Sequence, residues 1–144
     1  MKRIILNLTQ HPATPEQVEA GVVEPSAPLK ERIQKLLTFD ELPSLPEIRE
    51  RARKLVETID DYLEDLEKRG VIATSPSGEA NYEVYGAMIG GAPYLMRPLE
   101  EELIKAGVKP LYAFSKRITS ELRKPDGTVE KRSIFVHAGF IEVE

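Results

Sequence analysis

The stretch IILNLTQHPATPEQ, residues 4–17, contains a short apolar strand, a polar loop and the start of a helix. Residues 3–8 are mostly apolar, as is typical of parallel strands that are buried on both faces. Thr14 and Gln17 lie three residues apart in a capping-box pattern, which predicts that a helix begins after the threonine. The loop at residues 9–13 therefore follows the carboxyl end of a strand, where open α/β sheets bind ligands.

The rest of the chain alternates predicted helices and strands. Apolar residues at helical spacing, strand-like apolar runs and a Pro-Asp-Gly turn signal carry this prediction. We expect helices over residues 29–39, 45–69 and 94–106, strands over 82–89 and 111–114, and a hairpin that joins 118–123 to 128–136. This order predicts a single α/β domain over residues 1–144, with a compact Rossmann-like, mostly parallel sheet, helices on both faces and a C-terminal β-hairpin.

The composition excludes several classes of protein. The chain has no cysteine and two histidines, so disulfides, thiolate chemistry and a multi-histidine metal site are excluded. No apolar run suits a signal peptide or a membrane span, and we expect a cytoplasmic protein with no metal, no cofactor and no membrane partner. The net charge of −4 argues against binding of long nucleic acid. Residues 107–137 nevertheless hold seven bases and three acids, so this segment could bind a small polyanion.

The predicted helix over residues 45–69 carries a group of acids that suggests paired-carboxylate catalysis. These acids alternate with apolar positions and lie among lysines and arginines, which is typical of a solvated helix face. We therefore assign no catalytic role to Asp60, Asp61, Glu64, Asp65 and Glu67.

Three predicted strands end in residues that suit an anionic ligand. The first ends at Thr9, Gln10 and His11, the second at Gly90 and Gly91, and the third at Ser115, Lys116 and Arg117. Because the carboxyl ends of parallel strands share one edge, we expect these residues to line one crevice. A helix N-terminus after Thr14, close backbone approach at the glycines and a two-pronged arginine would each favour a phosphate.

Each of these motifs also has a purely structural interpretation. A Gly-Gly pair before a helix is often only a tight turn, and this one is neither a dinucleotide fingerprint nor a P-loop. His11 could be incidental, and Lys116 with Arg117 could form an exposed strand patch. His137, the second histidine, follows an apolar run and is a further candidate for the crevice.

Three segments are similar to a family of small uncharacterised bacterial and phage proteins: LNLTQHPATPEQ at residues 6–17, AMIGGAPYLM at 87–96 and PLYAFS at 110–115. A strand with a polar end, then His-Pro-x-Thr and a helix, more distantly resembles the small CRISPR-ancillary ring nucleases of antiviral defence. That resemblance implies a CARF-like Rossmann fold and a homodimer that binds, and often cleaves, cyclic oligoadenylate second messengers. It places Thr9, Gln10, His11 and Thr14 at the ligand, with Gly90 and Gly91 lining it; Lys116 and Arg117 are placed there by topology alone.

We expect a metal-independent phosphodiesterase in which a ribose 2′-hydroxyl attacks the adjacent phosphate of a cyclic oligonucleotide. Histidine titrates near neutral pH, so His11 is the best candidate acid or base, while Lys116 or Arg117 would hold the phosphate. A cyclic ligand also suits a two-fold dimer. Two alternatives stay open: a non-catalytic sensor or sponge, and an enzyme for another small phosphate or carboxylate. The expected catalytic residues are His11 and Lys116, and the expected ligand-binding residues are Thr9, Gln10, Thr14, Gly90, Gly91, Ser115 and Arg117.

Overall fold

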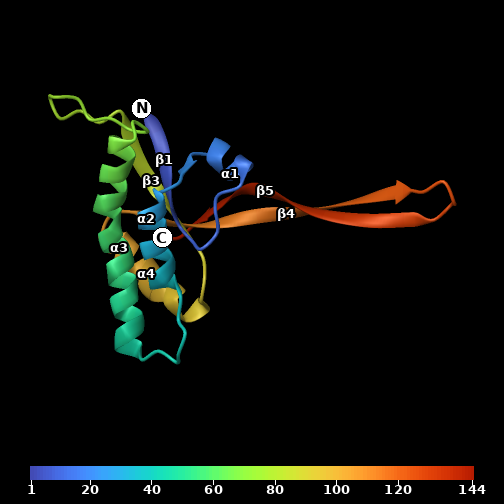
Figure 1. Ribbon diagram of the computed structural model, residues 1–144, viewed down its shortest axis with the longest axis horizontal. Coiled ribbons are helices and arrows are strands. Elements are labelled where there is room, and N and C mark those ends of the chain that lie inside the picture. The colour runs from blue at the N-terminus through green and yellow to red at the C-terminus, as the bar shows by residue number, and fades with distance from the viewer.

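The computed structural model describes residues 1–144, which form one five-stranded sheet and four helices (Figure 1). In chain order the elements are β1 (Lys2–Leu8), α1 (Pro15–Glu19), β2 (Val22–Val23), α2 (Ala27–Leu37), α3 (Leu45–Lys68), β3 (Tyr82–Ile89), α4 (Pro93–Lys105), β4 (Lys109–Arg123) and β5 (Val129–Glu142).

The sheet has the order β2-β1-β3-β4-β5 and mixes two kinds of pairing. β1 pairs in parallel with β2 and β3, and β3 pairs in parallel with β4, whereas β4 and β5 are antiparallel. The predictions of a mixed α/β fold and of a C-terminal antiparallel strand pair are confirmed. The prediction of a mostly parallel sheet holds only in part, because 12 residue pairs are parallel and 13 are antiparallel.

The three long helices, α2, α3 and α4, cover one face of the sheet. The main core lies there and packs β1 side chains such as Ile4 and Leu6 against α3 side chains such as Leu55 and Leu66. Right-handed crossovers explain this arrangement, because β2 to β3 and β3 to β4 both step in the same direction across the sheet. The step from β1 to β2 runs the other way, and the only helix in this connection is the five-residue α1. The prediction of helices on both faces is therefore wrong for the long helices, which all lie on one face.

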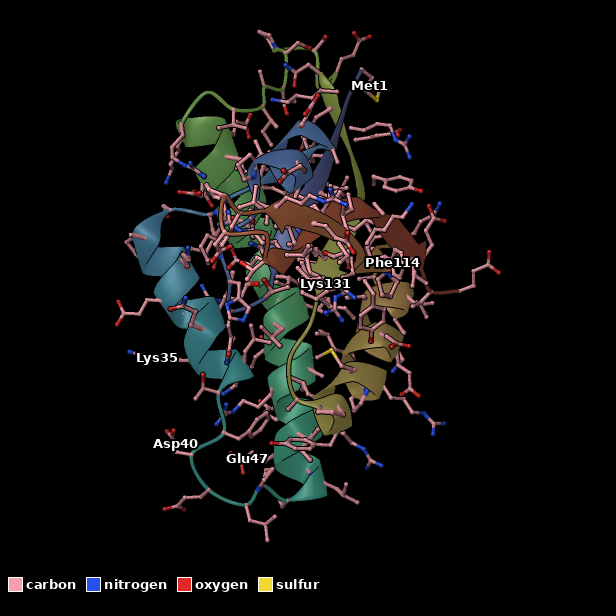
Figure 2. The ribbon with its side chains drawn as sticks, turned by 90° about the vertical axis from the view of Figure 1, so that its right-hand side faces the viewer. Met1, Lys35, Asp40, Glu47, Phe114 and Lys131 are labelled. Carbon is pink, nitrogen blue, oxygen red and sulfur yellow. The ribbon has the colours of Figure 1, made fainter.

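Beyond Leu111, β4 leaves β3 and continues with β5 as a two-stranded ribbon, residues 112–123 and 129–141. The ribbon extends far from the body in Figure 1 and points toward the viewer in Figure 2, where Phe114 and Lys131 are labelled. Most of its side chains are exposed. The predicted end of the third strand at residues 115–117 is wrong, because β4 runs without interruption to Arg123.

Three of the five acids on the acidic face of α3, Asp61, Glu64 and Asp65, are paired with bases, as expected of a solvated helix face. Arg32 lies 2.7 Å from the Asp61 carboxylate, and Lys68 lies 3.1 Å from that of Glu64. Such exposed pairs each contribute about 0 to 1 kcal/mol to stability. The pairing of these acids with bases is consistent with a solvated surface of α3 and not with a catalytic site.

Asp65, at the end of α3, accepts hydrogen bonds from the Ser26 amide at 3.1 Å and the Arg69 guanidinium at 2.8 Å. Burial raises the pKa of the Asp65 carboxyl, but the hydrogen bonds from Ser26 and Arg69 outweigh burial and hold its pKa below its usual range. A carboxyl with a lowered folded-state pKa stabilises the fold above its ordinary pKa, and that stability is lost as the pH falls through the folded-state value.

We expect Asp65→Asn to lower the free energy of unfolding by about 1 kcal/mol at pH 7, since a hydrogen-bonded charge is lost. The difference from the wild type should shrink below about pH 4, where the wild-type carboxyl also becomes neutral. Urea unfolding of both proteins at several pH values measures this difference. A difference that stays constant from pH 7 to pH 2 would show that the ionised carboxylate contributes nothing.

Candidate functional site

A cavity of about 400 Å³ lies at the carboxyl ends of β1 and β3, and we call it the strand-end cavity. Its volume falls in the range of small-molecule sites. The chain moves from β1 to β2 in one direction across the sheet and later to β3 in the other, so the cavity occupies the topological switch point. Six predicted residues line it, namely Thr9, Gln10, His11, Thr14, Gly90 and Gly91, together with Pro12, Gln17, Met88, Ile89, Tyr112 and Ala113.

The loop at residues 9–13 is held by the buried side chain of Asn7, the penultimate residue of β1. Asn7 Nδ2 donates to the His11 carbonyl at 2.9 Å and to Glu24 Oε1 at 3.1 Å. Asn7 Oδ1 accepts from the amide of Thr9 at 3.0 Å and from its hydroxyl at 2.7 Å. All these bonds fix the backbone that carries the polar residues of the cavity.

A second set of hydrogen bonds joins this loop to the main core. The Tyr62 hydroxyl of α3 accepts from the Asn7 amide at 3.0 Å and donates to the Val23 carbonyl. Burial raises the pKa of Tyr62 further above its already high value, so this hydroxyl stays protonated and keeps donating. Glu24 Oε1 accepts from the Ala13 amide, whereas Glu24 Oε2 is buried without a hydrogen-bond partner. The shape of the cavity therefore depends on residues that are far apart in the sequence.

Replacing Asn7 with leucine is expected to lower the free energy of unfolding by about 2 kcal/mol, because several buried groups lose their partners together. Amide hydrogen exchange at residues 9–13 should also become faster. Asn81→Leu is the matched control, since Asn81 is exposed and its side chain accepts only one hydrogen bond, from the Ala73 amide. Equal exchange rates at residues 9–13 in the wild type and Asn7→Leu would contradict the anchoring role of Asn7.

The predicted capping box at the start of α1 is confirmed, and it changes what this helix offers a ligand. Thr14 Oγ1 accepts from the Gln17 amide at 3.2 Å, and Gln17 Oε1 accepts from the Thr14 amide at 3.0 Å. These bonds occupy donors that the sequence interpretation had assigned to an anion. With five residues, α1 also has a small dipole. Thr14 therefore offers its hydroxyl to the cavity, and the helix terminus offers little.

At the end of β3, Gly90 and Gly91 line the cavity with backbone atoms, since neither residue has a side chain. A Cβ atom at Gly90 would meet only Thr9 Cγ2, at 3.7 Å, so this position borders open space. Gly91 has a φ of 142°, which favours glycine. The following helix, α4, begins at Pro93, and no side chain caps it. Unsatisfied amides at such a helix start favour an anion nearby.

Ser115, Lys116 and Arg117 do not line the strand-end cavity. Because β4 does not end, each further residue lies about 3.3 Å farther along the ribbon, and Lys116 is three residues beyond the cavity wall at Ala113. Arg117 instead donates to the hydroxyl of Ser133 across the ribbon at 3.1 Å. The prediction that these three residues share a crevice with the other two strand ends is wrong for a single copy of the chain.

Tyr112 lines the part of the strand-end cavity where we expected Lys116 and Arg117. Its hydroxyl donates to the Glu100 carboxylate of α4. Burial and the neighbouring Glu100 raise the pKa of Tyr112, so the hydroxyl remains uncharged at physiological pH. No lysine or arginine lines the cavity, and the titratable residues that line it are His11 and Tyr112.

The two histidines have different surroundings. His11 is exposed at the cavity, and its imidazole makes no ion pair, whereas its backbone is held by Asn7 and Thr9. His137 lies on the ribbon, outside the cavity, with its ring 4.8 Å from that of Phe140 and its Nδ1 atom buried without a partner. His11 is thus the histidine available to a ligand in the cavity.

No group of three or more histidine, cysteine, aspartate or glutamate side chains is arranged to hold a metal ion. None of the helices has the length and apolar character that a membrane crossing requires. The functional side chains of the strand-end cavity are therefore hydroxyl, amide and imidazole groups, with bare backbone at the glycines.

Comparison with known proteins found one family whose model matches most of the chain. No curated protein and no solved structure matches the chain. A family model described as the uncharacterized protein MJ1673 family matches residues 3–141, a span that includes the strand-end cavity and the ribbon. The predicted membership of an uncharacterised family is confirmed, and the resemblance to ring nucleases stays a prediction. The chain belongs to the uncharacterized protein MJ1673 family.

Proposed function

We propose that this protein binds a cyclic oligonucleotide, such as a cyclic oligoadenylate, at the strand-end cavity and cleaves it without a metal ion. The observation that carries the proposal is the convergence of six polar or glycine residues on one cavity at the switch point between β1 and β3. Ligands of open α/β sheets bind at this point, and nucleotides are frequent among them. The same topology supports a Rossmann-like, CARF-like relationship for the parallel part of the sheet.

The donors of the cavity suit a phosphodiester and its ribose. Thr9 and Thr14 offer hydroxyls and Gln10 offers an amide, while the backbone at Gly90 and Gly91 can approach a phosphate closely. A volume of about 400 Å³ suits one nucleotide unit better than a whole ring. A ring would therefore extend out of the cavity, and a two-fold dimer could hold it at two equivalent positions.

In the proposed reaction, His11 accepts the proton of a ribose 2′-hydroxyl. The 2′-oxygen then forms a bond to the adjacent phosphorus, and the bond from phosphorus to the 5′-oxygen breaks. The leaving 5′-oxygen takes up a proton from water, and His11 releases its proton to solvent, so the products are a 2′,3′-cyclic phosphate and a 5′-hydroxyl. Positioning of the 2′-oxygen and donors around the phosphate would supply most of the rate.

A non-catalytic sensor or sponge is the second candidate, and one observation favours it. No carboxylate orients the His11 imidazole, and no lysine or arginine lines the cavity of a single chain to neutralise the phosphate. Binding needs neither of these features. The same residues would then hold the ligand unchanged.

Incubating the purified protein with labelled cyclic oligoadenylates of several ring sizes in EDTA tests both candidates. Products that end in a 2′,3′-cyclic phosphate would support the enzyme, and a bound but unaltered ring would support the sensor. Failure to bind any ring would exclude both. An enzyme for another small phosphate or carboxylate at the same cavity would then be the remaining candidate.

A further inference from the structure

The ribbon has one apolar face. Residues that pair across two strands point to the same side, and side chains alternate along each strand. Ile118 therefore shares one side of the ribbon with its partner Ile134, and Val136, the partner of Lys116, lies on that same side. We call Phe114, Ile118, Leu122, Ile134 and Val136 the apolar ribbon face.

The apolar ribbon face lies open in a single copy. Phe114 is 53% exposed and Ile134 is 59% exposed. Beyond the sheet edge the ribbon has only two strands, and a two-stranded hairpin is at best marginally stable in water. Exposed apolar faces of this kind indicate an interaction surface. The opposite face is more polar, with Thr119 hydrogen-bonded to Ser133, and its exposed apolar side chains are Phe135 and Val129.

We propose that a second copy of this chain covers the apolar ribbon face, and that the two ribbons lie antiparallel about a two-fold axis at Ile118. The spacing of the apolar residues carries this inference. Phe114 and Leu122 are each four residues from Ile118, so the axis places Ile118 opposite itself and Phe114 opposite Leu122 of the second copy.

The charges on this face agree with the same axis. Lys116 lies two residues before Ile118 and Ser120 lies two residues after it, so the axis places one opposite the other. On β5, the pairing register likewise places Arg132 opposite Val136. No two like charges meet directly, which favours this antiparallel arrangement.

The area of the apolar ribbon face indicates that the ribbon tips also make contacts. A segment from residue 113 to residue 123 is about 35 Å long and roughly 10 Å wide, or roughly 350 Å² per copy. A stable dimer buries about 800 Å² per copy, so the remainder has to come from each tip lying on the body of the other copy. Residues 113–141 hold six bases and three acids, whereas the remainder holds 14 bases and 21 acids, so tip and body attract.

The two-fold axis brings each tip to the cavity of the other copy. Lys124 lies six residues after Ile118, and Tyr112, which lines the strand-end cavity, lies six residues before it. Lys124 of the second copy thus stands at the wall of a cavity that has no lysine or arginine of its own. This part of the inference rests on the proposed function, since it assigns to Lys124 the contact with a ligand phosphate.

The interface can be tested without any ligand, because the chain has no cysteine and single cysteines can be introduced. Packed sheets lie about 10 Å apart, so a short bismaleimide spans them while a direct disulfide does not. Ile118→Cys should crosslink to a covalent dimer. The matched control Thr119→Cys, on the opposite face, should stay uncrosslinked.

The antiparallel direction has its own test. Phe114→Cys alone and Leu122→Cys alone should not crosslink, because identical residues would be about 27 Å apart. The two variants co-expressed should crosslink to each other. A wild-type protein that sediments as a monomer, or crosslinking of Thr119→Cys as complete as that of Ile118→Cys, would overturn the interface. Ribbons that purify with bound nucleic acid, without crosslinking of Ile118→Cys, would overturn it in favour of that partner.

The shared cavity is tested by mixing two impaired chains, at a ring concentration below the wild-type dissociation constant. Lys124→Ala should weaken ring binding at least fivefold, and His11→Ala should slow cleavage at least 100-fold. When the two variants are refolded together, half of the dimers are mixed and each has one intact cavity, so about a quarter of the sites should recover. No recovery would overturn the role of Lys124. If no ring binds at all, the proposed function and this role both fail, and the crosslinking result stands by itself.

Discussion

Replacing His11 with alanine is expected to slow cleavage of a cyclic oligoadenylate at least 100-fold, while affinity for the ring falls less than tenfold. A general acid or base contributes about 10²- to 10⁴-fold to such a reaction. His11 is the histidine that lines the strand-end cavity, and its neighbour Tyr112 has a raised pKa and remains a neutral donor. No other lining residue can accept the 2′-hydroxyl proton near neutral pH.

The second histidine provides the matched control for this experiment. His137 lies on the ribbon and outside the cavity, so His137→Ala should retain cleavage within a few-fold of the wild type. Single-turnover rates and ring affinities of both variants, measured in EDTA, separate chemistry from binding. Unchanged cleavage by His11→Ala would show that another group moves the proton and would leave His11 only a binding role.

Replacing Gly86 with alanine is expected to lower the free energy of unfolding by roughly 3 kcal/mol, because overpacking at this site cannot be relieved by a side-chain movement. A Cβ atom at Gly86 would lie 2.5 Å from the carbonyl oxygen of Lys109 and 2.9 Å from Leu111 Cδ1. The parallel pairing of β3 with β4 comprises three residue pairs, and Gly86 with Lys109 is one of them. Pushing these strands apart therefore weakens the junction that carries the ribbon.

Gly90→Ala is the matched control, four residues along the chain. Its Cβ atom would meet only Thr9 Cγ2 at an ordinary 3.7 Å, so its free energy of unfolding should stay within about 0.5 kcal/mol of the wild type. Urea unfolding of the three proteins measures the difference. Equal stability of Gly86→Ala and Gly90→Ala would contradict the described register of β3 and β4.

Elements with strong local signals could be predicted from the sequence. The apolar run at residues 3–8 and the capping pattern at Thr14 predicted β1 and the start of α1. The predicted helix over residues 45–69 closely matches α3, because its apolar spacing and its serine cap are both local. The same signals predicted which residues from β1 and β3 would line the cavity.

The ribbon and its bases could not be placed in the same way. Local sequence shows that residues 111–123 favour a strand, and it does not show where a neighbouring strand stops. β3 ends at Ile89, so β4 loses its parallel neighbour after Leu111 while keeping β5. Lys116 and Arg117 were predicted at the end of a strand, but they lie within β4, on the ribbon. The two-residue strand β2 was missed because it is too short to show a pattern.

The buried network under the cavity was also missed. An asparagine inside an otherwise apolar strand was the available signal, since a buried amide needs partners. Those partners, Glu24 and Tyr62, lie 17 and 55 residues farther along the chain. Contacts between residues so far apart in the sequence depend on the packing of α3 against β1, which no local pattern specifies.

An NMR titration of the amide-labelled protein with cyclic oligoadenylates tests the strand-end cavity most directly as the binding site. The cavity is lined by Thr9, Gln10, His11, Thr14, Gly90 and Gly91, and the amide signals of these residues should shift first and furthest and should saturate. Shifts confined to other parts of the chain, or none with any ring, would contradict the account.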